Sequence, residues 1–186
     1  MSNFYKINLE KIKKNKLNIS IIGLGYVGLN LLIHLSETRN KIYGVDSDLN
    51  KISLIKRGKS YINYIADDKI KKIKKKSIFS SNYNSIKNSD VIILCLPTPL
   101  KNNKPDLTFL KKACMSLKNK ICAGQVIILE STSYPGTTEE FLYKNLNLKR
   151  FRIGEDLFLG FSPEREDPGN KKFSLTKIQK VVSGYT

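Results

Sequence analysis

A chain of 186 residues, with 40% apolar and 26% charged side chains, has the length and composition of one soluble globular domain with a buried core, or of one such domain and the beginning of another. Its formal net charge of +17 comes from 28 Lys and 5 Arg scattered along the chain, which disfavours a nucleic-acid surface, because such surfaces cluster their charge and use more Arg. The three cysteines, Cys95, Cys114 and Cys122, form no CxxC pair and follow no secretion signal, which argues against a disulfide framework and favours a cytoplasmic protein.

The first 16 residues are polar and rich in Lys. Phe4, Ile7, Leu9 and Ile12 recur among them at loosely helical spacing. We therefore predict an amphipathic leader over residues 1–16, followed by a domain over residues 17–186.

From Leu17 onward, short apolar runs alternate with segments of helical pattern. Strands are predicted at Leu17–Ile22, Lys41–Val45, Ile78–Ser80, Val91–Leu96, Val126–Leu129 and Leu157–Phe161. Helices are predicted from the glycine-rich turn after Ile22 to about Thr38, and at Asp48–Lys56, Leu107–Leu117 and Thr137–Leu146. Alternating strands and helices with short loops predict an α/β fold: a Rossmann-type, doubly wound parallel sheet in a single domain.

The stretch Ile19–Leu35 is apolar enough to suggest a membrane span. It contains three glycines, Asn30 and His34, however, and about 17 residues are few for a spanning helix. A buried strand that runs into a buried helix has the same hydropathy, so we expect no membrane span. His34, the one histidine, is expected to pack against the sheet.

The basic run Lys69–Lys76 also has two interpretations. Ile70 and Ile73 lie three residues apart, which is typical of one apolar stripe on a solvated helix and not of a polyanion site. Tyr61 and Tyr64 are likewise expected to be surface packing residues, not a platform for stacked bases.

The clearest local signal is Gly23-Leu24-Gly25-Tyr26-Val27-Gly28, which follows a predicted strand and opens a helix. In such a turn the first glycine permits the tight bend, the second lets the backbone approach a pyrophosphate, and the third lets the helix pack closely on the strand. The next strand ends at Asp46, where a carboxylate can accept both adenosine-ribose hydroxyls and would repel the 2′-phosphate of NADP. The pattern predicts NAD binding; the alternative is a glycine turn that packs but binds nothing.

Polar residues also follow three later strands. These segments are Cys95-Leu96-Pro97-Thr98-Pro99, Glu130-Ser131-Thr132 and Ser162-Pro163-Glu164-Arg165. Ligands of doubly wound sheets bind beyond the carboxyl ends of the strands, so we expect the three segments to meet at one edge. Each hydroxyl could instead cap a helix or turn, as Thr137-Thr138-Glu139-Glu140 is expected to do.

Six segments occur in order and at regular intervals: IIGLGYVGLNL, GVDSD, CLPTPL, ESTSYPGTT, SPEREDPGN and KVVSGYT. Together they resemble the UDP-glucose/GDP-mannose dehydrogenase family from about residue 17 to the end. SPEREDPGN (162–170) is most similar to the branch that acts on UDP-N-acetylhexosamines. The resemblance implies oxidation of the C6 alcohol of a UDP-sugar to a uronate for surface polysaccharide synthesis, with two NAD⁺ used in succession and a cysteine that traps the aldehyde.

The resemblance also implies a role for each matching residue. The pyrophosphate of NAD would lie against Gly23, Gly25, Tyr26, Val27 and Gly28, and the adenosine ribose against Asp46 and Lys51. Pro97, Thr98, Ser131 and Thr132 would lie near the rest of the cofactor, with Thr132 also ordering the catalytic water. Glu164 would perform acid–base work, helped by partial burial that raises its pKa, and would contact the UDP-sugar together with Arg165. An ion pair between these last two residues is the alternative.

The family's nucleophilic cysteine, in a Gly-x-Cys-x-Pro motif, and the Lys and Asn of its central helix have no counterpart in the sequence. We therefore expect a chain truncated before the central helix and the carboxyl-terminal domain, which needs that missing half, or a homodimer mate, for turnover. A non-catalytic NAD-binding module is the first alternative, and a basic nucleic-acid-binding protein is the less favoured one. No metal site is expected.

Overall fold

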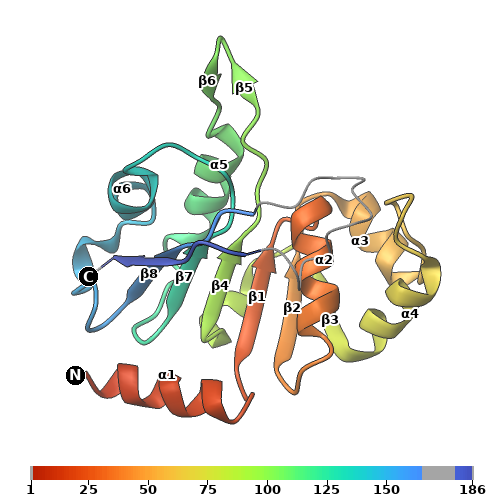
Figure 1. Cartoon of the computed structure of the whole chain (residues 1–186), viewed down its shortest axis with the longest axis horizontal. Coiled ribbons are helices and arrows are strands. Elements are labelled where there is room, and N and C mark those ends of the chain that lie inside the picture. Colours follow the sequence, from red (N-terminus) through yellow and green to blue (C-terminus); the bar gives the residue numbers. More distant parts are fainter. Residues whose placement is uncertain (1, 165–178, 186) are drawn as a thin grey trace.

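The computed structural model describes residues 2–164 and 179–185, and the apolar runs within them form one sheet (Figure 1). Its strands are β1 (Asn18–Ile22), β2 (Lys41–Val45), β3 (Ser77–Ser80), β4 (Val91–Leu94), β7 (Val126–Leu129), β8 (Phe158–Phe161) and β9 (Ser183–Tyr185). They lie in the order β3-β2-β1-β4-β7-β8-β9, and every neighbouring pair from β3 to β8 is parallel. The prediction of a doubly wound parallel sheet is confirmed.

Helices follow the strands as the sequence predicts. They are α1 (Asn3–Lys13), α2 (Tyr26–Leu35), α3 (Leu49–Lys56), α4 (Asp67–Lys76), α5 (Thr108–Leu117) and the short α6 (Tyr143–Asn145). Single turns of other helix types occur at η1 (Asn84–Asn88), η2 (Thr137–Leu142) and η3 (Leu148–Arg150). A hairpin of β5 (Leu100–Lys101) and β6 (Lys104–Pro105) projects away from the sheet in Figure 1.

The sheet is buried on both faces. In a strand successive side chains point to opposite faces, and accordingly Ile21 packs with one cluster and Ile22 with the other. The first cluster contains residues of α2, α3 and α4, and the second contains residues of α5 and η2. This double burial explains why the central strands read as continuous apolar runs. Among the described residues, no helix has the length and apolarity to cross a membrane.

Several local predictions differ from the structure. The helix expected to reach Thr38 ends at Leu35, because the hydroxyls of Ser36 and Thr38 donate to the carbonyl oxygens of Ile33 and Leu35 and compete with further helical turns. The strand expected to reach Leu96 ends at Leu94. The hairpin, η1 and β9, which is antiparallel to β8, were not predicted.

The prediction that His34 packs against the sheet is wrong. The inward face of α2 is formed by Gly28, Leu29 and Leu32, and His34 lies on the exposed face. The prediction for the basic run is confirmed, since Ile70 and Ile73 are the buried residues of α4.

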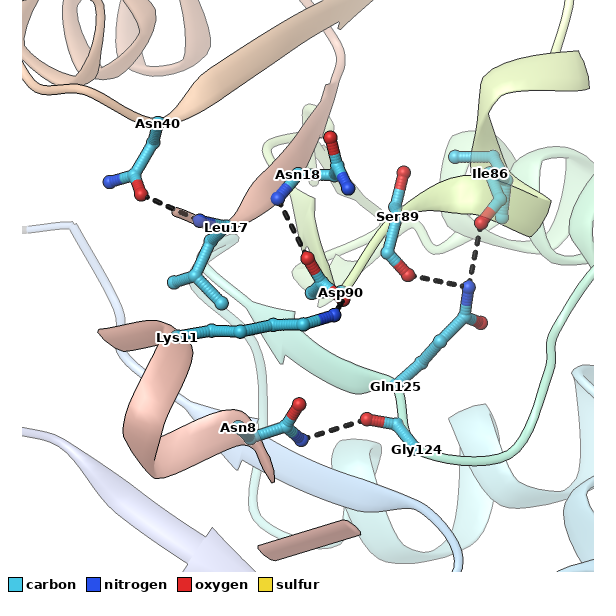
Figure 2. A network of polar contacts seen from close by, with 10 residues as sticks. All are labelled: Asn8, Lys11, Leu17, Asn18, Asn40, Ile86, Ser89, Asp90, Gly124 and Gln125. Atoms are coloured by element: carbon cyan, nitrogen blue, oxygen red, sulfur yellow. Dashed lines mark hydrogen bonds and ion pairs between the residues drawn. The ribbon is translucent and has the colours of Figure 1, made fainter. Parts of the chain in front are cut away.

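Helix α1 is fixed to the amino-terminal edge of the sheet (Figure 2). The Lys11 ammonium lies 2.6 Å from Asp90 Oδ1, just before β4, and Asp90 Oδ2 accepts a hydrogen bond of 2.8 Å from the backbone N–H of Asn18 in β1. The side-chain amide of Asn8 donates to the carbonyl oxygen of Gly124, just before β7, at 2.8 Å. The predicted leader is therefore a helix that braces the starts of three strands; the division of the chain at residue 17 stays a prediction.

Gln125 extends this network into the interior (Figure 2). It is 2% exposed, and its side-chain amide donates to the carbonyl oxygens of Ile86 and Ser89 at 2.6 and 2.8 Å. Its own side-chain oxygen accepts from the backbone N–H of Cys122. One buried side chain thus bonds three backbone groups; the Ile86 carbonyl also accepts from the backbone N–H of Ser89, whereas strand pairing leaves the Ser89 carbonyl and the Cys122 N–H to Gln125.

Candidate functional site

A cleft of about 730 Å³ opens at the carboxyl-terminal edge of the sheet. Strands β1 and β4 are neighbours there, although β2 and β3 intervene in the chain, so the strand order reverses between them. Such a switch point is where doubly wound sheets bind ligands. The cleft is lined by Ile22, Gly23, Gly25, Tyr26, Val27, Val45, Asp46, Ser47, Asp48, Lys51, Tyr83, Cys95, Leu96, Pro97, Thr98, Phe109, Glu130, Ser131, Thr132 and Glu164.

Two glycines of the turn after β1 are required by packing. Gly23 has φ +89°, and a Cβ added to it would lie 2.4 Å from the carbonyl oxygen of Cys95. A Cβ on Gly28 would lie 1.9 Å from the carbonyl oxygen of Gly23. The first glycine therefore permits the turn and the third permits close approach of α2, as the sequence motif predicts.

Packing does not require a glycine at the middle position of the motif. Gly25 has φ −73°, which any residue adopts, and a Cβ there would meet no atom within 4 Å. It stands as the N-cap of α2, and no side chain caps the helix. The positive end of α2 thus faces the cleft through Gly25, Tyr26 and Val27, which line it. Gly28 lies behind them, outside the lining.

Asp46 is placed beside the glycine-rich turn and is 7% exposed. Its Oδ2 accepts a hydrogen bond of 2.7 Å from the backbone N–H of Leu24 and lies 3.2 Å from the Lys51 ammonium. Its Oδ1 accepts from the backbone N–H of Asp48 at 2.9 Å. The two residues expected at the adenosine ribose are therefore an ion pair on one wall of the cleft.

Pro97, Thr98, Ser131 and Thr132 lie together at the other end of the cleft. The Ser131 hydroxyl accepts from the backbone N–H of Leu96 at 2.9 Å, and the Thr98 hydroxyl donates to the carbonyl oxygen of Thr132 at 2.6 Å. These bonds tie the loops after β4 and β7 to each other. The Thr132 side chain is exposed to the cleft, whereas the Ser131 side chain is buried and hydrogen-bonds to the backbone.

Three charged groups meet where β7 and β8 end and β9 begins. The side chains of Glu130 and Glu164 are 4% and 6% exposed, and the Lys180 ammonium pairs with both, 3.0 Å from Glu164 Oε2. Burial raises the pKa of Glu130, although Lys180 opposes this. Burial alone would lower the pKa of Lys180, but its bonds to both carboxylates raise it. Arg165, which was expected to contact the UDP-sugar with Glu164 or, alternatively, to pair with it, lies outside the described residues.

Neither buried thiol, Cys95 in the lining of the cleft or Cys114 in α5, has the character of a nucleophile. Burial raises the pKa of the Cys95 thiol, with Glu130 adding to the effect, so the thiol stays protonated. Burial also raises the pKa of Cys114 to about 12. For Cys95 and Cys114 this agrees with the expectation that neither matches the family's nucleophile.

Sequence reasoning missed several residues of the cleft. Ser47 and Asp48 follow the predicted acidic residue directly and could have been included. Tyr83 and Phe109 form apolar walls but come from a loop and from α5, where nothing in the sequence marks them. Lys180 is one of 28 lysines and has no local signal.

A family model for the NAD-binding domain of the UDP-glucose/GDP-mannose dehydrogenase family matches residues 17–186. Among curated relatives, the chain is 37% identical over 171 residues to protein CapL of Staphylococcus aureus, covering 91% of this chain and 40% of the relative. It is 36% identical over 172 residues to UDP-N-acetyl-D-glucosamine 6-dehydrogenase of Pseudomonas aeruginosa, with the same two coverages. The chain therefore spans about 40% of the length of these relatives.

Solved structures agree. The UDP-D-ManNAc dehydrogenase of Pyrococcus horikoshii matches with a TM-score of 0.73 and 32% identity, over 82% of this chain and 37% of that one. The NDP-N-acetyl-D-galactosaminuronic acid dehydrogenase of Methanosarcina mazei matches with a TM-score of 0.82 and 26% identity, over 99% of this chain and 42% of that one.

Proposed function

The chain belongs to the UDP-glucose/GDP-mannose dehydrogenase family, whose NAD-binding domain it matches, and from this premise we propose how its cleft works. The cleft above β1 and β4 holds NAD for the oxidation of the C6 alcohol of a UDP-sugar. The sugar is a UDP-N-acetylhexosamine, as the names of the relatives and the SPEREDPGN segment suggest.

Gly25 is the observation that carries the proposal. Its backbone conformation and its surroundings would both accept a side chain, so the protein's own packing does not explain the glycine. A ligand that must approach the backbone closely does explain it. Since Gly25 begins α2, the positive helix end favours an anionic group there, and the pyrophosphate of NAD fits.

The other walls fit the remaining parts of NAD. The adenosine ribose lies against Asp46, whose carboxylate accepts its hydroxyls while Lys51 pairs with the same carboxylate. Negative charge at this position disfavours the 2′-phosphate of NADP. Pro97, Thr98, Ser131 and Thr132 surround the nicotinamide end, near Glu130 and Glu164.

When bound, NAD⁺ would supply the hydride acceptor for the C6 carbon of the sugar, and the proton of the C6 hydroxyl would pass to an ordered water. Thr132 offers an exposed hydroxyl that holds a water at the reacting carbon, and Glu164 exchanges a proton with that water. Lys180 holds the Glu164 carboxylate at the edge of the cleft. Glu164 and Arg165 contact the UDP-sugar.

The second oxidation needs an accessible thiolate, which neither Cys95 nor Cys114 offers, so a partner segment or chain supplies it in a cytoplasmic enzyme.

Calorimetric titration with NAD⁺, NADP⁺ and UDP-N-acetylglucosamine tests the proposal. We expect measurable NAD⁺ binding, and NADP⁺ binding weaker by at least about tenfold, because one unfavourable charge contact is worth about 1.4 kcal/mol or more. We expect the isolated chain to form no UDP-sugar carboxylate from NAD⁺ and the UDP-sugar, because the second oxidation needs the thiolate. Absence of NAD⁺ binding, or equal affinity for NADP⁺, would refute the proposed site.

A further inference from the structure

Tyr61 contacts the glycine-rich turn from a distant part of the chain. It lies between α3 and α4, is half-buried, and donates its hydroxyl hydrogen to the carbonyl oxygen of Leu24 at 2.6 Å. It does not line the cleft. The backbone N–H of the same Leu24 donates to Asp46, so both polar groups of this buried residue are bound by side chains.

The carbonyl of Leu24 belongs to the same planar peptide group as the N–H of Gly25. In a trans peptide these two groups point in opposite directions. The hydroxyl that holds the Leu24 carbonyl therefore aims the Gly25 N–H away from Tyr61. In the part of the chain that the structure describes, the Gly25 N–H donates to no protein acceptor, and Gly25 lines the cleft.

We propose that Tyr61 is a positioning residue for dinucleotide binding: it fixes the peptide plane that presents the Gly25 N–H to the pyrophosphate. The inference rests on the proposed function of the cleft, which it deepens. The expected packing role of Tyr61 holds for its ring, which packs against the buried cluster that contains Leu24; the inference adds a role for its hydroxyl. Tyr64 fits that interpretation better, since it is 52% exposed and its ring packs edge-on against Tyr26, with centroids 5.2 Å apart.

Two observations make Tyr61 suited to this task. Its backbone is anchored, because the N–H of Ser60 donates to Asp67 at the start of α4 at 2.8 Å and the Lys59 ammonium pairs with the same carboxylate. Burial, together with the negative charges of Asp46 and Asp48, raises the pKa of the Tyr61 hydroxyl. The hydroxyl therefore remains a donor over the whole physiological pH range.

Tyr61→Phe tests the inference, because it removes the hydroxyl and keeps the ring. The affinities of wild type and variant for etheno-NAD⁺, ADP-ribose and adenosine are compared, the last two by competition against etheno-NAD⁺ fluorescence. We expect etheno-NAD⁺ and ADP-ribose to bind about 5- to 10-fold more weakly, which corresponds to about 1–1.4 kcal/mol, and adenosine to change less than about twofold. Tyr143→Phe is the matched control, since it removes the hydroxyl of another partly buried tyrosine away from the cleft.

A second measurement keeps the inference testable even if the variant loses stability. Hydrogen exchange of the ligand-free proteins should show faster exchange at 23–27 in Tyr61→Phe and not in Tyr143→Phe. Unchanged affinities in Tyr61→Phe would overturn the inference, and so would equal losses for all three ligands, which indicate general loosening. If wild type itself binds no etheno-NAD⁺, the proposed function fails first.

Discussion

Replacing Asp46 by Asn separates the charge of this side chain from its shape. In the structure its two oxygens serve the backbone N–H groups of Leu24 and Asp48 and the Lys51 ammonium. An amide of the same size has one oxygen, so one of these N–H groups would face an NH₂ group. We expect the ligand-free variant to lose about 1–3 kcal/mol of stability, the usual cost of an unsatisfied buried donor.

The effect on cofactor affinity follows from the same geometry. Hydrogen bonds to a charged group contribute about 1.5–3 kcal/mol each, and the amide keeps one acceptor for the ribose hydroxyls. A net loss of about 2 kcal/mol for NAD⁺ corresponds to roughly 30-fold weaker binding. NADP⁺ should bind no more weakly than before, since the negative charge is gone and Lys51 is released to meet a phosphate.

Calorimetry with both cofactors, below the unfolding temperature of each protein, measures the ratio of the two affinities. Asp106→Asn is the control, because this partly exposed carboxylate accepts hydrogen bonds from Thr108 at the start of α5, outside the cleft. An NAD⁺ to NADP⁺ ratio in Asp46→Asn within about twofold of the wild-type ratio would refute the assignment of the ribose, since even 1 kcal/mol would change it about fivefold.

Three further predictions concern residues at the carboxyl-terminal edge of the sheet, where the cleft lies, and at its amino-terminal edge. Gly28→Ala should lose at least about 3 kcal/mol of stability because its Cβ overlaps backbone, whereas Gly25→Ala should unfold at the wild-type temperature yet bind NAD⁺ at least about tenfold more weakly. Thermal unfolding and calorimetry on both variants check this, and equal stabilities would contradict it. Lys180→Met should lose about 3 kcal/mol at pH 8 and clearly less at pH 5. Burial already raises the folded pKa of Glu130, removing Lys180 raises it further, and stability is then lost as pH rises through that value. Urea unfolding at the two pH values measures the difference, and a loss independent of pH would argue against the ion cluster. Gln125→Leu should lose about 2–4 kcal/mol, since the Ser89 carbonyl and the Cys122 N–H lose their partner while the Ile86 carbonyl keeps its bond from the Ser89 N–H. The NAD⁺ affinity of the folded protein should stay unchanged; a weakened affinity would show that the two edges are coupled.

Much of the part of the cleft around the glycine-rich turn could be predicted because its signals are local. Gly23, Gly25 and Gly28 fall within six residues, and Asp46 ends the next strand. Strand and helix patterns around them leave only a few arrangements of a parallel sheet, and consecutive strands of such a sheet are usually neighbours, so the meeting of Asp46 with the glycine-rich turn follows from topology.

The other contacts of the site could not be predicted, because they join residues that are far apart in the sequence. Lys180 meets Glu130 across 50 residues, and Tyr61 meets Leu24 across 37, with no pattern to join them. His34 was misplaced because an apolar neighbourhood hides which face of a helix a residue occupies. The short strand β9 was missed because three residues carry no periodicity, and its pairing with β8 decides its conformation.

The brace formed by α1 has a practical consequence. Lys11 and Asn8 tie this helix to the starts of the strands, so the amino terminus emerges on the side of the molecule opposite the cleft (Figure 1). A fluorophore or surface tether attached ahead of Asn3 would leave the cofactor entrance unobstructed. Deleting the helix to shorten the protein would instead expose Asp90 and remove the contacts that hold the amino-terminal ends of the central strands together.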